Sequence, residues 1–311
     1  MNIVGPQTGG DPMGKTKFVR RSLQTVSTEL AMQGYSACPT TVARLLRTQD
    51  YSPRINVKRF TGADHPDRDR QFVNIQEWID IFEEAGLPII SVDGKKKELI
   101  GNFKNPGAVW CDEPEEVNVY DFLTDAVCRA TPYGIYDLLW GRGHVCVGTS
   151  SDTPAFAVAA IGTWWARYGC KRYRGANELL ILADGGGSNG HRPRLWKTSL
   201  QERIADRYGL HVTVCHYPTG ASKWNPVEHR LFGPVSINWA GQPLRSLDIL
   251  LGWIRGTKVG GVGVTASLDQ TTYPTKVKVT NAEMNRLDLE QHEVCPNWNY
   301  TISPRHSELL N

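Results

Sequence analysis

The order of short apolar segments and longer helix-like segments between residues 87 and 239 is the sequence feature that most restricts the fold. Three apolar segments come first, and helix-like segments then alternate with two more apolar ones. Strands that alternate with helices of this length favour an α/β domain, a mixed sheet with helices on its faces. We expect strands over 87–92, 98–103, 144–148, 178–183 and 212–216, and helices over 72–85, 154–168, 193–208 and 225–239.

Positive charge is concentrated in the first 60 residues. They carry nine Lys and Arg against three acids, a net charge of +6, whereas the whole chain carries +3, so residues 61–311 sum to −3. A basic segment on a slightly acidic body indicates that the first part of the chain meets a polyanion. The alternative is a pair of solvated basic helices without a partner.

Two short helices are expected in this basic segment. Apolar residues recur at helical spacing within residues 20–33, Gly34 ends that helix, and Pro39 begins a second one. Two helices joined by a tight turn are typical of a helix-turn-helix module, in which the start of the second helix contacts DNA. A plain helical hairpin is the alternative. The expected DNA contacts are Thr40, Thr41, Arg44 and Arg47.

Composition and cysteine use narrow the class of protein further. Hydrophobic residues make up 40% and charged residues 22% of the 311 positions, as in ordinary soluble proteins. No apolar run is long enough to span a membrane and no secretory signal is visible, so we expect no membrane partner. Seven scattered cysteines without a C-x-x-C pair argue against a zinc knuckle and favour reduced thiols in a cytosol-like compartment.

Stretches rich in Gly, Pro and charge divide the chain into five parts. We expect a flexible tail over 1–14, a small all-α helix-turn-helix module over 15–60, a linker over 61–75, the α/β domain over 76–255, and a C-terminal extension over 256–311 with strands at 277–280 and 298–302.

Three carboxylates lie where this order of elements brings them together. Asp93 follows the first strand, Asp184 follows the fourth, and Glu228 is in the first turn of the last helix, at separations of 91 and 44 residues. The order is that of a ribonuclease-H-like domain, in which the first and fourth strands are neighbours. Mg²⁺ prefers oxygen ligands, and two such ions stabilise the attacking and leaving oxygens of a phosphoryl displacement. The sequence therefore predicts a two-metal site.

Each acid also has a purely structural explanation. Asp93 and Gly94 together are a hairpin-turn signal. Asp184 precedes three glycines and can simply begin a loop, while Asn225 and Glu228 have the spacing of a capping box. Only the joint placement of the three acids favours chemistry.

Residues near the three acids fit a nucleic-acid site. The lysine run after Asp93 is suited to a phosphate backbone, although a solvated turn explains it equally well. Gly185–Gly187 would let a strand approach closely, and His229 is placed to orient a phosphate or carry a proton, unless it is simply an exposed helix residue. The expected DNA contacts here are Lys95, Lys96, Lys97, Asn189, Lys223, Trp224, His229 and Arg230.

At these motifs the sequence resembles the bacterial insertion-sequence transposases of the ISAzo-thirteen family, a DDE group with a ribonuclease-H-like catalytic domain. The resemblance covers most of the chain from Thr40 to Ile302, and its longest stretches are ISVDGKKKELIGNFKN (90–105), LILADGGGSNG (180–190) and CHYPTGASKWNPVEHRLF (215–232). The catalytic acids of that family correspond to Asp93, Asp184 and Glu228.

The resemblance implies a DNA transposase of the bacterial cytosol and nucleoid. Asp93 would bridge two Mg²⁺ ions, or Mn²⁺, with Asp184 and Glu228 completing the separate sites. Hydrolysis at an element end would free a 3′-hydroxyl, which then attacks target DNA by the same displacement. Double-stranded DNA, both element ends and target, is the implied partner, and pairing of two ends implies a homo-oligomer.

Two alternatives stay open. One is a ribonuclease-H-like nuclease that only hydrolyses, which a strand-transfer assay with pre-cleaved ends would identify. The other is an inactive, truncated transposase remnant that only binds DNA, which metal titration would identify. The second is considered because family members tend to begin further upstream, and because Gly94 and Tyr120 stand where Thr and His are expected.

Overall fold

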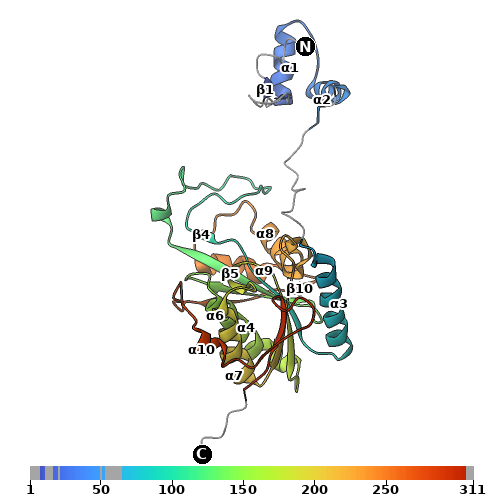
Figure 1. The fold of residues 1–311 in the computed structure, drawn as a ribbon. Coiled ribbons are helices and arrows are strands. Elements are labelled where there is room, and N and C mark those ends of the chain that lie inside the picture. The colour runs from blue at the N-terminus through green and yellow to red at the C-terminus, as the bar shows by residue number, and fades with distance from the viewer. Residues whose placement is uncertain (1–7, 11–16, 20–21, 50, 53–64, 306–311) are drawn as a thin grey trace, which may run out of the picture. The chain divides into compact units, whose positions relative to one another are not determined.

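The computed structural model describes residues 8–10, 17–19, 22–49, 51–52 and 65–305. The chain falls into two compact units, residues 1–61 and residues 62–311 (Figure 1). Each unit is described by itself. No helix in the described ranges is both long and apolar enough to cross a membrane.

The first unit holds the predicted helix pair, α1 (Leu23–Met32) and α2 (Pro39–Thr48). Ser22 caps α1, since its hydroxyl accepts a hydrogen bond from the Thr25 amide at 3.1 Å. Gly34 has a φ of +85° and reverses the chain before α2, so the expected pair and its turn are confirmed. The expected tail over 1–14 is wrong in part, because β1 (Thr8–Gly10) pairs antiparallel with β2 (Lys17–Val19).

The second unit is built on a nine-stranded mixed sheet with the order β11-β6-β5-β3-β7-β8-β13-β12, and β4 pairs with β5 beside that path. Among the central strands, β6, β3, β7 and β8 run parallel and β5 alone runs against them. The predicted neighbourhood of the first and fourth strands is confirmed, as is the ribonuclease-H-like mixed sheet with flanking helices. The bounds are β3 (Ile89–Gly94), β4 (Glu98–Ile100), β5 (Cys128–Asp137), β6 (Arg142–Gly148), β7 (Glu178–Ala183), β8 (His211–His216), β11 (Thr265–Asp269), β12 (Leu289–Gln291) and β13 (Asn299–Ile302).

Helices cover both faces of this sheet (Figure 1). One face packs against α4 and α6 around Trp164 and Trp196, and the other packs against α3, η7, α8 and α9. Neighbouring strand residues therefore alternate between two apolar layers, with Ile90 and Val92 in the first and Ile89 in the second. The helical bounds are α3 (Arg68–Glu84), α4 (Pro154–Trp164), η3 (Trp165–Gly169), α5 (Cys170–Arg172), α6 (Arg194–Leu200), η5 (Gln201–Ala205), α7 (Asp206–Tyr208), η7 (Val227–Phe232), α8 (Gly233–Asn238), α9 (Leu247–Gly256) and α10 (Asn281–Met284).

Several expected boundaries are wrong. The segment expected as a strand over 98–103 is strand only at β4, and the long partner of β3 is β5, which the sequence did not suggest. Helix α3 begins inside the expected linker, at Arg68. No strand forms at 277–280, whereas β11 and β13 place much of the expected C-terminal extension in the central sheet.

Candidate active site

Asp93 lies near the carboxyl end of β3 and points to the sheet face covered by η7. Side chains alternate along a strand, so Asp93 shares its face with Ser91, which is fully buried. The strand does not turn at this point: the Cα partner of Asp93 is Gly134 on β5, and both β3 and β4 pair with β5 rather than with each other. Asp93 is therefore not a hairpin-turn residue.

Asp184 directly follows β7, the parallel neighbour of β3. It is two residues beyond Leu182, which belongs to the same apolar layer as Ile89, so strand alternation turns Asp184 toward the face of Asp93. The two aspartates accept equivalent hydrogen bonds from the glycine that follows each of them. Asp184 Oδ1 accepts the Gly185 amide at 2.7 Å, as Asp93 Oδ1 accepts the Gly94 amide at 2.7 Å.

Glu228 is brought to the aspartates by a polar clasp between η7 and β3. The Ser91 hydroxyl accepts the Val227 amide at 3.0 Å and is hydrogen-bonded to the side chain of Asn225. Asn225 is fully buried and its amide also reaches the Val92 carbonyl at 3.5 Å. Because the Asn225 side chain faces β3, it does not cap η7, and the capping-box explanation is wrong.

The three acids interact electrostatically. Burial, followed by the charge of Asp184 and the proximity of Glu228, raises the pKa of Asp93 to about 8. Both Glu228 and Asp184 are therefore close enough to Asp93 to disfavour its charged form. Asp93, Asp184 and Glu228 are separated by 91 and 44 positions in the sequence, yet they form one cluster. The surroundings of this cluster disfavour the charged form of Asp93.

The cluster is not a closed metal cage. Over the part of the chain that the structure describes, no three His, Cys, Asp or Glu side chains are gathered into a ready-made metal site. The acids are thus near enough to act on one another electrostatically without forming a ready-made metal site.

A fourth acid, Asp152, lies beside the cluster and was not expected. A Cβ built on Gly94 would stand 3.5 Å from Asp152 Oδ2, an ordinary van der Waals contact. The charges of both Asp93 and Asp152 reinforce the effect of burial, which raises the pKa of Tyr133 well above its usual value. Asp152 precedes the Thr153 cap of α4, so only the fold brings it to β3.

The comparisons with known proteins are consistent with this geometry. The family described as the Rhodopirellula transposase DDE domain matches residues 1–304. The chain belongs to this family. The predicted resemblance to DDE insertion-sequence transposases is thereby confirmed. No curated protein sequence matches it.

Solved structures with a similar fold are complexes of the Mos1 transposase. The Mos1 paired-end complex with left transposon end has 12% identity and a TM-score of 0.43 over 75% of this chain. The Mos1 mariner paired-end complex with Mn has 13% identity and a TM-score of 0.42 over 79% of this chain and 73% of that chain. The present chain spans 65% of the length of the first Mos1 chain.

Two of the expected DNA contacts near the acids, Lys95 and Asn189, are paired or buried within the fold. Lys95 makes an ion pair with Glu98 at 2.5 Å, and its ammonium lies 4.8 Å from the centre of the Trp239 ring. Asn189 is 1% exposed; its backbone carbonyl lies 3.0 Å from His216 Nε2, and its side-chain nitrogen is buried. Because the Lys95 charge is paired with Glu98 and the Asn189 side chain is buried, we do not retain Lys95 or Asn189 as DNA contacts.

The other expected contacts near the acids have exposed side chains. Lys223 lies 4.0 Å above the Trp224 ring, which is 43% exposed, and Arg230 lies 5.8 Å from the Tyr136 ring. A Cβ at Gly186 or Gly187 would meet nothing within 4 Å, so the loop after Asp184 leaves space for a ligand strand. The exposed members are Lys96, Lys97, Lys223, Trp224, His229 and Arg230.

The expected contacts of the helix-turn-helix all lie on α2 in the first unit. Thr40, Arg44 and Arg47 are exposed. Thr41 is half-buried, with its hydroxyl 3.3 Å from Cys38 Sγ. Their part in DNA binding stays a prediction.

The clasp gives a first prediction for this site. Asn225→Ala removes the buried link between η7 and β3, and we expect DNA cleavage to fall by about 10–100-fold because Glu228 loses its fixed position. Unfolding should become easier by only about 1–3 kcal/mol, the usual cost of stranding a buried partner. Cleavage assays and urea denaturation measure the two effects. Equal losses in Asn238→Ala, a polar link between α8 and α9, would contradict a specific role for the clasp.

Proposed function

We propose that this transposase cuts and joins DNA at the ends of an insertion sequence in a divalent-metal-dependent reaction, with Asp93, Asp184 and Glu228 as the metal ligands. The observation that carries the proposal is the cluster of three distant acids. Asp93 interacts electrostatically with both Asp184 and Glu228, and each of the three acids is placed by a different element. A structural carboxylate would instead have a cationic partner or a cap.

The residues fit a divalent cation chemically. All three supply carboxylate oxygens, the donors that Mg²⁺ and Mn²⁺ prefer, and each lies on or next to a rigid element. When bound, divalent ions supply charge neutralisation at the attacking and leaving oxygens of a phosphodiester. Asp93 would hold the cation together with Asp184 and Glu228, since it interacts with both of the other acids.

Neighbouring groups of the chain would orient the three acids and leave space for the DNA strand. The clasp of Ser91 and Asn225 fixes where Glu228 stands, and the amides of Gly94 and Gly185 orient the two aspartates. The open loop at Gly186–Gly187 would admit the strand to be cut. No side-chain nucleophile is required, since a water and then a 3′-hydroxyl can attack phosphorus directly.

Double-stranded DNA is the proposed substrate. Lys96, Lys97, Lys223 and Arg230 would contact phosphates near the cluster, and the exposed ring of Trp224 offers a stacking surface. Thr40, Thr41, Arg44 and Arg47 on α2 would hold the element ends. Pairing of two ends requires two copies of the chain, so the active form is proposed to be a homo-oligomer.

The raised pKa of Asp93 gives a second prediction, on how stability depends on pH. Because the folded pKa of Asp93 is about 8, above its ordinary value of 3.8, the folded state holds a proton that the unfolded state has lost between those pH values. In EDTA, stability should therefore fall as pH rises from about 4 to about 8. Asp93→Asn should flatten this slope, and Mg²⁺ should reverse the loss at pH 8. Thermal melts across pH check this, and a slope unchanged in Asp93→Asn would contradict it.

A strand-transfer assay tests the proposed function. Pre-cleaved element ends with a free 3′-hydroxyl are incubated with target DNA and Mg²⁺ or Mn²⁺. Joined product that disappears with EDTA supports a transposase. Hydrolysis without joining would instead indicate a nuclease, and metal-independent DNA binding without either reaction would indicate a remnant that only binds DNA.

A further inference from the structure

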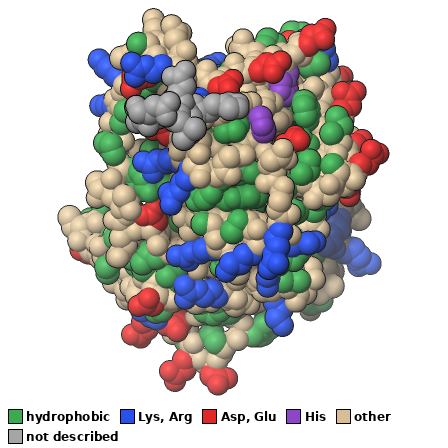
Figure 2. All heavy atoms as spheres, turned by 90° about the horizontal axis from the view of Figure 1, so that it is seen from below, with side chains coloured by type: hydrophobic (Ala, Val, Ile, Leu, Met, Phe, Trp, Pro, Cys, Tyr) green, Lys and Arg blue, Asp and Glu red, His purple; other side chains and the backbone are tan. Residues whose placement is uncertain are grey.

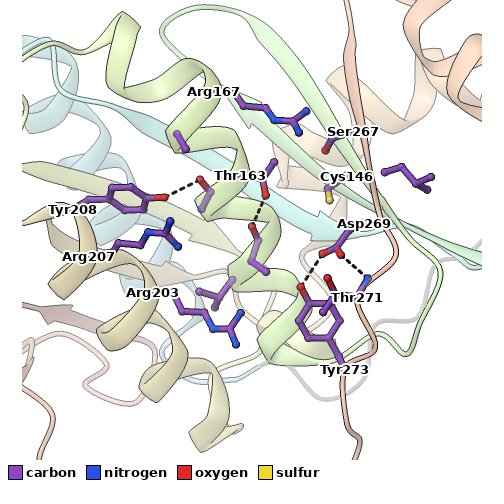
Figure 3. Close-up of a pocket in the computed structure, with 15 residues that line it drawn as sticks. Cys146, Thr163, Arg167, Arg203, Arg207, Tyr208, Ser267, Asp269, Thr271 and Tyr273 are labelled. Atoms are coloured by element: carbon purple, nitrogen blue, oxygen red, sulfur yellow. Dashed lines mark hydrogen bonds between the residues drawn. The ribbon is translucent and has the colours of Figure 1, made fainter.

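A groove lined by arginines runs over the outer side of α4 (Figure 3). Its volume is about 420 Å³, and the three carboxylates of the cluster are not among the described residues that line it. Arg167 comes from η3 at the end of α4, Arg203 and Arg207 come from η5 and α7, and Asp269 comes from the end of β11. We call this the arginine groove.

The three arginines are exposed, and their charges are not paired with acids of the described residues. Within the described residues none of their guanidinium groups forms an ion pair or a hydrogen bond, and all three line the same groove. Arg207 lies 5.4 Å over the ring of Tyr208, which orients its guanidinium without neutralising it. Exposed arginines that line one groove and have no ion-pair partner among the described residues are an electrostatic site for an anion.

The titratable groups around the arginines do not cancel this charge. Asp269 is the one acid among the described lining residues, and it already accepts the Tyr273 hydroxyl at 2.7 Å and the Thr271 amide at 2.9 Å. His144 lies beneath the groove, where burial and then the charge of Arg167 lower its pKa to about 3, so it stays neutral. The groove therefore carries net positive charge at neutral pH.

Positive charge continues beyond the groove. Lys171 and Arg172 on α5 and Arg174 two residues later are exposed, and α5 directly follows η3. Figure 2, which views the α7 end of the unit, shows Lys and Arg side chains gathered in a band across that face. A row of cations longer than one pocket suits a ligand with many regularly spaced negative charges.

We propose that the arginine groove binds phosphate groups of the DNA backbone at a place separate from the strand being cut. Arginine forks match phosphate oxygens, and such contacts position DNA without reading its sequence. This inference rests on the proposed function, since it takes the macromolecular anion to be DNA. An acidic surface of a second copy and a free phosphate ion are the competing occupants.

The test uses the full chain and a triple variant, Arg167→Gln, Arg203→Gln and Arg207→Gln. Binding to a duplex without element-end sequences is followed by fluorescence anisotropy over a range of NaCl concentrations. Loss of three phosphate contacts should reduce the slope of log affinity against log salt by about 2–3. The Arg→Lys triple variant should keep most of the slope. The matched control removes three exposed cations outside the groove, Arg129→Gln, Lys258→Gln and Lys278→Gln.

The outcomes separate the occupants. A reduced slope in the groove variant, but not in the control, supports the proposal. An unchanged slope overturns it, as does an equal loss in the control. A thermal shift with 10 mM inorganic phosphate that the groove variant loses while its DNA slope is unchanged would show a free-anion site. A change confined to sedimentation would show a contact between copies. Either of these results overturns the DNA assignment.

Failure of this inference is distinguishable from failure of the proposed function. At saturating DNA the groove variant keeps all three carboxylates, so metal-dependent nicking should continue. If nicking persists and DNA binding is unchanged, only the groove assignment fails. If Mg²⁺ has no effect on nicking by the parent chain, the proposed function fails, whatever the groove binds.

Discussion

Asp184→Asn is expected to reduce metal-dependent strand nicking by at least about 10³-fold while DNA-end binding stays within about twofold. The substitution keeps the size of the side chain and its acceptor for the Gly185 amide, but it removes the charge that a cation would bind. An ion that stabilises the transition state by several kcal/mol is then lost, and each 1.36 kcal/mol is a factor of ten in rate. Nicking of a labelled end under single-turnover conditions measures the effect.

A remote acid provides the control for Asp184. Asp248→Asn, in the first turn of α9, removes the same charge from an exposed position. It should leave nicking unchanged. If Asp184→Asn nicks as well as Asp248→Asn, then Asp184 is a loop residue after β7 and the proposed metal site is wrong.

Trp196→Ala is expected to destabilise the second unit by about 3–5 kcal/mol, the largest stability effect predicted for this chain. Trp196 is fully buried on α6, and its indole nitrogen donates to the Tyr300 hydroxyl at 2.9 Å. The alanine leaves a large cavity against α4 and removes the link between α6 and β13. Guanidinium denaturation should show a clearly lower midpoint with an unchanged m-value.

Two controls separate packing from hydrogen bonding at Trp196. Trp196→Phe keeps most of the apolar volume and loses the donor, so it should cost less than the alanine. Trp110→Ala should have almost no effect, because Trp110 is fully exposed. A Trp196→Ala chain as stable as Trp110→Ala would mean that α6 does not pack on the sheet as described.

The strand that sequence patterns missed shows where such reasoning fails. β5 contains Pro132 and Gly134, residues that usually argue against a central strand. In the fold, a Cβ on Gly134 would stand 2.6 Å from the Phe232 ring, so glycine is needed to let η7 approach the sheet. The reason for that residue lies about 100 positions away in the sequence, and no local pattern contains it.

The strands on which the acids are placed were predictable, and the contacts of the acids were not. After Glu178, β7 is a continuous apolar run that is buried on both faces, and its predicted bounds are those observed. By contrast, the clasp of Ser91 with Asn225 and the approach of Asp152 to Gly94 join segments far apart in sequence. The sequence predicts Lys95 as a DNA contact, but in the fold its ammonium pairs with Glu98 and lies over the ring of Trp239.

The most direct test of a shared metal site is anomalous diffraction from crystals of the full chain soaked in Mn²⁺. The account predicts a peak within coordination distance, about 2 Å, of carboxylate oxygens from Asp93 and from at least one of Asp184 and Glu228. The peak should vanish in Asp184→Asn crystals or lose occupancy there. Ordered carboxylates with no manganese between them at millimolar concentration, or manganese bound only elsewhere, would contradict the account.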